Sequence, residues 1–302
     1  MGELNVFTRW PGFIGKENIT SIGDWTKERL DKLNKEVSDA PQYEIATFKS
    51  TRIALGQSVQ VRKKNVLEFV VMNRFWDIPE SERQSFLVDK LNTNFSLEYG
   101  VSDKFTLGFG AATWDGIFNG FAKYSLSRQR KNAKKMPVSI TLFQNASYRS
   151  RDFFNVAKFD EFNDRFSFTT QLLIAKKITT NSSFQIAPTF IHRNSSVFDN
   201  DPENHFAIGF GGRRKIGKHA SLVSEYFYVA NPLKSKETYN AFSIGVNWEL
   251  SYIMLQFHFT NARTMEESAF ITQTTNNFNS DDGKLHFGFN ATFTLQLDKK
   301  KR

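Results

Sequence analysis

Residues 284–297 read Lys-Leu-His-Phe-Gly-Phe-Asn-Ala-Thr-Phe-Thr-Leu-Gln-Leu, and this stretch decides the fold class. Apolar side chains occupy every second position, including Phe287, Phe289 and Phe293, and mostly polar or small ones occupy the positions between them. An amphipathic helix would instead repeat its apolar residues about every three to four positions. The two-residue period therefore predicts a β-strand with one face in an apolar medium.

The same alternation recurs along the chain, in segments of about 9 to 13 residues that suit a transmembrane strand. It accounts for the unusual number of 32 Phe residues in a chain of 302. The clear segments are 94–99, 105–110, 166–174, 184–190, 206–211, 242–248, 253–260 and 284–297. Weaker alternation marks 65–75, 117–127, 137–149 and 219–229. The sequence thus predicts an all-β fold, a closed antiparallel transmembrane β-barrel of about 12 strands.

A soluble β-sandwich is the main alternative, because its strands alternate in the same way. Sandwich strands are shorter, about 5 to 6 residues, and their cores mix Val, Ile and Leu instead of concentrating Phe and Tyr.

Composition excludes other classes of protein. The chain has no apolar run near the roughly 20 residues of a spanning helix, and 15% aromatic content excludes disorder. The absence of Cys excludes disulfides and thiolate metal sites.

The connections between these strands alternate in length, as an outer-membrane barrel with tight turns and longer outer loops requires. The short connections are 101–103, 178–181, 216–218 and 251, and the long ones are 76–92, 150–163, 195–203, 230–238 and 263–283. Two connections fit this rhythm imperfectly, a short one at 113–116 and a long one at 128–136. An even number of strands places both ends of the barrel domain on the periplasmic side.

Charge separates along the same axis, because the long loops are mostly acidic and the turns at 127–136 and 213–219 are basic. Basic turns favour contact with anionic lipid headgroups or with a periplasmic partner. No nucleic-acid recognition module surrounds the run from Arg128 to Lys135, so nucleic acid is not an expected partner. The expected partners are outer-membrane lipid and a periplasmic or membrane protein.

Residues 1–45 differ from the rest and are expected to form a periplasmic segment that precedes a barrel domain at 46–302. A helix is expected from Ser21 or Asp24 to about Val37. Residues 1–20 lack the apolar core of a signal peptide, so we expect either that the export signal was removed or replaced, or that the start is unusual. Residues 46–62 are β-prone but too polar for a lipid-facing strand. They either lead into the barrel or plug it.

The alternation also assigns polar side chains to the lumen, where they are the candidate functional residues. Buried charges must be paired or hydrated, and a barrel of intermediate size holds either a narrow pore or a lumen blocked by polar pairs. The lumen candidates are Glu68, Arg74, Glu98, Lys123, Glu249, Gln256, His258, His286 and Asn290.

Catalytic chemistry has one weak candidate, His258 with Thr260 and the following Asn261, since Thr can act as a nucleophile beside a base. These side chains alternate with Phe257 and Phe259, so they face the lumen and not a lipid substrate. We therefore expect no enzyme, cofactor or metal site.

The leading hypothesis is a non-enzymatic outer-membrane barrel, such as a narrow channel for small polar solutes. The alternatives are a structural or accessory barrel that docks a partner through residues 1–45 and the basic turns, and an outer-membrane lipid hydrolase.

With the strands placed, an ordered set of short motifs resembles a known family. The strongest are Gln256-Phe-His-Phe-Thr-Asn261, Phe270-Ile-Thr-Gln-Thr-Thr275 and His286-Phe-Gly-Phe-Asn290; weaker ones lie at 46–53, 66–75, 97–103, 120–124, 136–143, 188–194 and 225–228. The sequence is similar to an uncharacterised outer-membrane β-barrel family of the Bacteroidetes, known only as a domain of unknown function. The resemblance implies the barrel fold and the bacterial outer membrane, and it implies no activity.

Overall fold

The computed structural model describes residues 22–39, 42–75, 91–131, 135–151, 161–196, 200–278 and 285–297. Twelve strands in these residues form one closed barrel in which every neighbouring pair is antiparallel. The predicted fold class is therefore confirmed. Residues 1–21, most of loop 76–92 and the last five residues of loop 263–283 lie outside the described residues.

The strands run in sequence order around the barrel, and the last one pairs with the first. They are β1 (Val66–Phe75), β2 (Leu91–Ser102), β3 (Phe105–Ala112), β4 (Ile117–Ser127), β5 (Ser139–Arg149), β6 (Phe166–Lys177), β7 (Ser182–Arg193), β8 (Asn204–Lys215), β9 (Ala220–Val229), β10 (Phe242–Leu250), β11 (Ile253–Thr260) and β12 (His286–Gln296). Pairing of Val66 with Gln296 through Phe75 with Phe287 closes the ring. Closure leaves no sheet edge with unpaired backbone groups, which a membrane requires.

The two faces of the wall differ as the period-two pattern predicts. On β11, Phe257 and Phe259 are 36% and 53% exposed, whereas Gln256 and His258 between them are each 1% exposed. Aromatic rings on the outer face also contact across strands, as between Phe257 and Phe289 with centroids 5.2 Å apart. The barrel exterior is thus an apolar surface suited to lipid. Neither of the α-helices in the described residues is long and apolar enough to cross a membrane.

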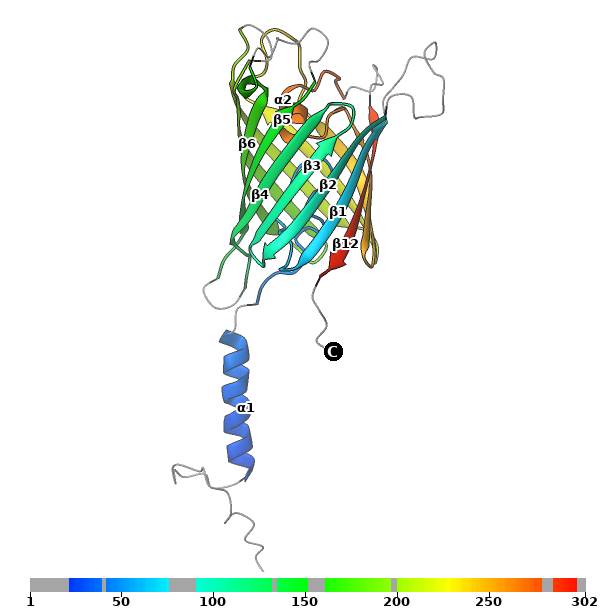
Figure 1. Cartoon of the computed structure of the whole chain (residues 1–302). Coiled ribbons are helices and arrows are strands. Elements are labelled where there is room, and N and C mark those ends of the chain that lie inside the picture. Colours follow the sequence, from blue (N-terminus) through cyan, green and yellow to red (C-terminus); the bar gives the residue numbers. More distant parts are fainter. Residues whose placement is uncertain are drawn as a thin grey trace, which may run out of the picture.

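Helix α1 (Ile22–Asp39) lies outside the barrel, beyond the end at which β1 begins and β12 ends (Figure 1). We call this end of the barrel the terminal end. The opposite end carries helix α2 (Glu267–Thr272) and the short 3-10 helix η2 (Asn163–Arg165), and we call it the loop end. The helix predicted from Ser21 or Asp24 is therefore present, with slightly different limits.

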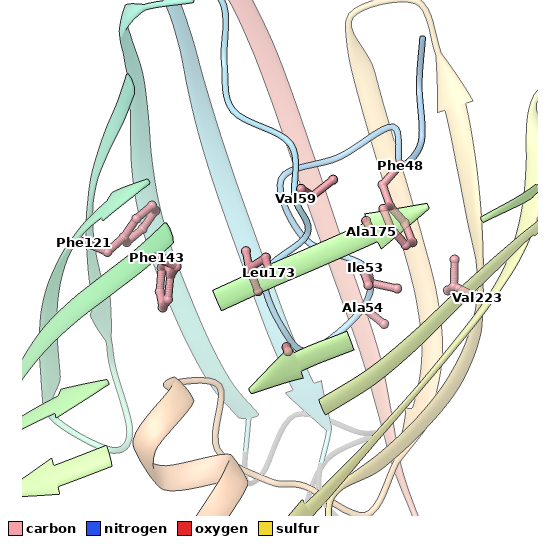
Figure 2. Packing of buried hydrophobic residues seen from close by; sticks show 10 residues of the cluster. Phe48, Ile53, Ala54, Val59, Phe121, Phe143, Leu173, Ala175 and Val223 are labelled. Atoms are coloured by element: carbon pink, nitrogen blue, oxygen red, sulfur yellow. The ribbon is translucent and has the colours of Figure 1, made fainter. Parts of the chain in front are cut away.

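The apolar core of the protein lies inside the barrel, around residues 46–62, which we call the inner plug. Figure 2 shows that the inner plug enters the lumen and places its apolar side chains against those of several strands. The buried cluster contains Phe48, Ile53, Ala54 and Val59 of the inner plug with Phe121, Phe143, Leu173, Ala175, Ala187 and Val223 of the wall. Of the two alternatives for residues 46–62, the structure has the plug.

Candidate functional site: the plugged lumen

The inner plug makes a tight turn whose backbone surrounds one carboxylate. The N–H of Ile53 donates to the carbonyl of Gly56 at 3.0 Å, which closes the turn. The three consecutive N–H groups of Ala54, Leu55 and Gly56 then donate to the carboxylate of Glu225 on β9, at 2.9, 2.6 and 3.1 Å. A short run of backbone N–H groups forms a concave site for an anion. Glu225 occupies that site and fixes the tip of the inner plug.

Backbone carbonyls of the inner plug accept hydrogen bonds from polar side chains of the wall. Lys123 Nζ on β4 donates to the carbonyls of Ser58 at 2.7 Å and Thr51 at 3.1 Å. Thr141 Oγ1 on β5 donates to the carbonyl of Val59 at 2.7 Å.

On the other side of the lumen, Gln256 Nε2 on β11 donates to the carbonyl of Ile53 at 2.8 Å. Asn290 Nδ2 on β12 donates to the carbonyl of Ala54 at 3.0 Å. A buried segment without secondary structure must find partners for its backbone groups. The wall supplies these partners from strands on several sides of the lumen.

Small residues on β8 make room for the inner plug. A Cβ added at Gly211 would lie 2.4 Å from Ile53 Cδ1, and one added at Gly209 would lie 2.6 Å from Phe227 Cε1. Phe227 in turn contacts the plug, because a Cβ at Gly56 would lie 2.6 Å from its ring. The glycines of β8 therefore provide lumen space that the inner plug and Phe227 occupy.

A second segment fills the lumen from the loop end. Residues 262–274, which we call the outer plug, follow β11 and contain α2, all of whose side chains are buried. Glu266 caps this helix by accepting from the N–H of Ala269 at 3.0 Å. Phe270 contacts Phe227 edge-on, with ring centroids 5.1 Å apart. Sequence analysis placed this segment in an outer loop and gave no sign that it folds back into the barrel.

The two plugs meet at one buried ion pair. Arg52 of the inner plug and Glu267 of the outer plug are 2.9 Å apart, and their side chains are 4% and 0% exposed. Gln57 Nε2 also donates to Glu267 Oε1 at 2.9 Å. The plugs thus form one continuous body inside the barrel, whose two halves come from distant parts of the chain.

The chain enters the barrel past the basic turn between β4 and β5. Glu44 lies 2.9 Å from Lys131 of this turn, and the hydrogen bond from Lys131 lowers the pKa of the Glu44 carboxyl. The Arg128 guanidinium lies over the ring of Tyr43, 4.9 Å from its centroid. Inside the terminal end, Arg62 pairs with Glu68 of β1 at 2.9 Å. These contacts fix the path of the chain from outside the barrel into the lumen.

The predicted lumen residues fall into two groups in the structure. Five of them contact the inner plug or the residues that join it to β1: Glu68 through Arg62, Glu249 through Lys49, and Lys123, Gln256 and Asn290 through plug carbonyls. The other four are buried, and in the described part of the chain they form no hydrogen bond or ion pair with the inner plug. Arg74 donates to Asn290, His286 contacts Asn276, and the side chains of Glu98 and His258 have no hydrogen-bond partner in the described part of the chain.

Sequence analysis missed several wall residues that hold the plugs. Glu225 and Thr141 are the most important, and both lie on strands whose alternation is weak. The available signal was the inward register of β9, where Val223, Glu225 and Phe227 share one face and place a carboxylate between two apolar residues. Such a mixed inward face predicts contact with protein and not with water.

The residues of the hydrolase hypothesis do not form a nucleophile and base. His258 is 1% exposed, and neither of its ring nitrogens has a hydrogen-bond partner in the described residues. Thr260 Oγ1 accepts from the N–H of Ala262 at 3.0 Å, and Asn261 Oδ1 accepts from the N–H of Phe242 at 2.8 Å. Within the described chain, no group of three or more His, Cys, Asp or Glu side chains could hold a metal ion.

Several solved structures of porins are similar to this chain. The NanC porin is 8% identical with a TM-score of 0.48, and the likeness covers 76% of this chain and 100% of that one. The KdgM porin is 7% identical with a TM-score of 0.46, covering 76% and 98%. No curated protein matches the sequence.

The barrel is an outer-membrane protein, because a closed antiparallel barrel with an even number of strands and an apolar exterior is the architecture of that membrane. The sequence matches the family described as membrane-bound β-barrel domain (DUF5777) over residues 48–295. The predicted barrel family of unknown function is thereby confirmed, whereas a Bacteroidetes origin stays a prediction. The chain belongs to the DUF5777 family of membrane-bound β-barrel domains.

Proposed function

We propose that the protein is a non-enzymatic outer-membrane channel for small polar solutes, closed at rest by its inner plug. The observation that carries this proposal is that polar side chains on several strands of the wall bind the backbone of residues 46–62. Lys123, Gln256 and Asn290 each donate to a plug carbonyl. If the inner plug leaves, these groups face an open polar lumen.

The size of the barrel supports a pore. Wall side chains fill a barrel of about eight strands, and barrels of about 16 to 18 strands leave an aqueous channel. The twelve strands here enclose more space than their own side chains occupy, since two further segments fit inside. Removal of the inner plug therefore leaves a lumen with polar groups on its wall, which the outer plug narrows at the loop end.

The absence of catalysis is part of the proposal. His258 faces the lumen beside Gly288, whose added Cβ would lie 2.2 Å from its Nε2. Its ring nitrogens hydrogen-bond to no hydroxyl among the described residues, and the wall of the barrel separates it from lipid. The arrangement supplies no activated nucleophile.

Two truncations with the same export signal test the proposal by single-channel conductance in planar bilayers. Removal of residues 2–45 leaves the inner plug in place and should leave the protein as silent as the full chain. Removal of residues 2–62 also takes away the plug, while β1 begins only at Val66. This second variant should show discrete current steps.

Folding of both variants is checked by heat-dependent mobility in a denaturing gel, because a closed barrel resists detergent until heated. A folded 2–62 truncation that passes no current contradicts the channel and leaves the barrel as an anchor for a partner. Lipid hydrolysis lost in His258→Ala would contradict the non-enzymatic assignment.

A further inference from the structure

The charged side chains of the inner plug are all basic. Residues 46–62 contain three Lys or Arg residues and no Asp or Glu. Each of the three pairs at 2.9 Å with a carboxylate of the barrel or of the outer plug: Lys49 with Glu249, Arg52 with Glu267, and Arg62 with Glu68. When the inner plug leaves, positive charge leaves the lumen and the carboxylates stay.

In the middle of the lumen, Lys123 of the wall faces several of these carboxylates. It interacts electrostatically with Glu68, Glu98 and Glu267. In the plugged state Arg52 and Arg62 share this negative charge, because each of them pairs with one of the three carboxylates. Their departure leaves one ammonium group of the wall against three carboxylates.

Glu98 is a buried carboxylate without a hydrogen bond even in the plugged state. Its side chain is 0% exposed, and neither of its oxygens has a hydrogen-bond partner in the described part of the chain. It lies on β2 directly opposite Glu68 of β1. Like charges in such a pair destabilise a sheet, and a buried acceptor without a partner is costly. A cationic ligand with N–H donors would satisfy both requirements.

The loop end does not share this excess of negative charge. Asp115 interacts electrostatically with Arg149 and Arg263, and Glu266 interacts in the same way with Arg193. These residues belong to the wall or to the outer plug, so they keep these partners when the inner plug leaves. The uncompensated carboxylates therefore lie in the part of the lumen that the inner plug vacates.

The wall also recognises peptide backbone in this part of the lumen. The side-chain amide of Gln185 on β7 donates to the carbonyl of Gln57 at 2.7 Å and accepts from the N–H of Val59 at 2.8 Å. Thr106 Oγ1 on β3 accepts from the N–H of Arg62 at 2.8 Å. Hydrogen bonds to main-chain groups do not depend on the sequence of the peptide that makes them, whereas side-chain sites give specificity.

We propose that the solutes of the opened lumen are short basic peptides, which take the place of the inner plug. Their backbone would bind groups such as Gln185 and Gln256, and their cationic side chains would bind Glu68, Glu98 and Glu267. The inference rests on the proposed function, since it names the class of solute that the channel admits. The inner plug and a basic peptide then compete for one site.

Hydrogen exchange of the amides in residues 46–62 tests this competition in the full chain in detergent. A ligand that binds only the unplugged lumen multiplies the population of that state by one plus the ratio of its concentration to its Kd. Acetylated and amidated tri-arginine at about ten times its Kd should therefore speed exchange about tenfold. Tri-glutamate with the same blocked ends is the matched control and should leave exchange unchanged. Sodium chloride equalises the ionic strength, because salt screens exposed charges.

Glu98→Gln separates the peptide from the plug, because Glu98 forms no hydrogen bond with the inner plug in the described residues. This change should weaken tri-arginine binding about tenfold, so that the same peptide concentration speeds exchange only about twofold over the basal rate of the variant. Glu237→Gln is the matched control, since Glu237 is exposed in the loop 230–238. Its response to tri-arginine should equal that of the unchanged chain.

Equal effects of the two peptides, no effect of tri-arginine, or a full response in Glu98→Gln overturns the proposal. Slow exchange in β1 and heat-dependent gel mobility show that the barrel stays folded throughout. The readout does not depend on conductance, so the two proposals fail separately. Current through the 2–62 truncation without a tri-arginine response removes only the peptide site, and a tri-arginine response with a silent truncation removes only the channel.

Discussion

The inner and outer plugs fill the same lumen in opposite ways. The inner plug (residues 46–62) has no helix or strand, only an isolated bridge between Arg52 and Gln57, and its backbone bonds to wall side chains. The outer plug (residues 262–274) contains α2, which satisfies part of its own backbone. It presents apolar side chains such as Phe270 and Ile271 to the wall.

This difference indicates which plug leaves the lumen more easily. Both plugs bury apolar side chains, such as Phe48 and Ile53 of the inner plug and Phe270 and Ile271 of the outer plug, so the way in which each plug is joined to the barrel decides. The inner plug is joined to the barrel only at β1, while the outer plug is fixed between β11 and β12. We therefore expect the inner plug to open first.

The largest effect is expected from Phe270→Ala in the outer plug. Phe270 is 0% exposed and packs on Phe227, so truncation should lower the free energy of unfolding by about 3–5 kcal/mol. Phe278→Ala is the control, because Phe278 is 46% exposed and its ring packs on those of Tyr226 and Phe242, contacts that are worth about 1 kcal/mol. Urea unfolding followed by tryptophan fluorescence measures both. Similar losses would contradict the apolar anchoring of the outer plug.

The junction between the plugs gives the next effect. Arg52→Ala removes the cationic partner of the buried Glu267 carboxylate. This change should lower the free energy of unfolding, measured in urea, by about 3 kcal/mol. Adding Glu267→Gln removes the buried charge, so the double variant should regain part of the loss. If the two changes are simply additive, the plugs are not coupled through this pair.

Much of the fold was predictable because lipid and lumen impose a two-residue period on every strand. This period also assigned Lys123 and Gln256 to the lumen. The position of residues 46–62 could not be predicted, because these residues lack the two-residue alternation of the strands. Their position depends instead on wall residues that are distant in the sequence. Glu225 and Thr141 were missed for a related reason. Their strands carry apolar inward residues that pack on the plugs, and these residues weaken the alternation.

A smaller effect tests the polar attachment of the inner plug. Thr141→Val keeps the shape of the side chain but removes the bond to the carbonyl of Val59, which should cost about 1 kcal/mol. Hydrogen exchange of amides in residues 46–62 should rise about fivefold. Thr170→Val is the matched control, since Thr170 bonds to Gln144 on the lipid-facing side of the wall. Unchanged exchange in Thr141→Val would show that apolar packing alone holds the plug.

The smallest effect is expected where the inner plug reaches water at the terminal end. Lys49 pairs with Glu249 of β10 at 2.9 Å, but the two side chains are 37% and 35% exposed. An ion pair at this exposure contributes about 0.2–1 kcal/mol and is screened by salt. A double-mutant cycle with Lys49→Ala and Glu249→Ala, measured by urea unfolding, should therefore give a coupling energy smaller than the loss of stability expected for Thr141→Val. This coupling energy should decrease in 1 M salt. A larger coupling that persists in salt would mean that the terminal end is the main attachment of the inner plug, and opening would then have to begin deeper in the lumen.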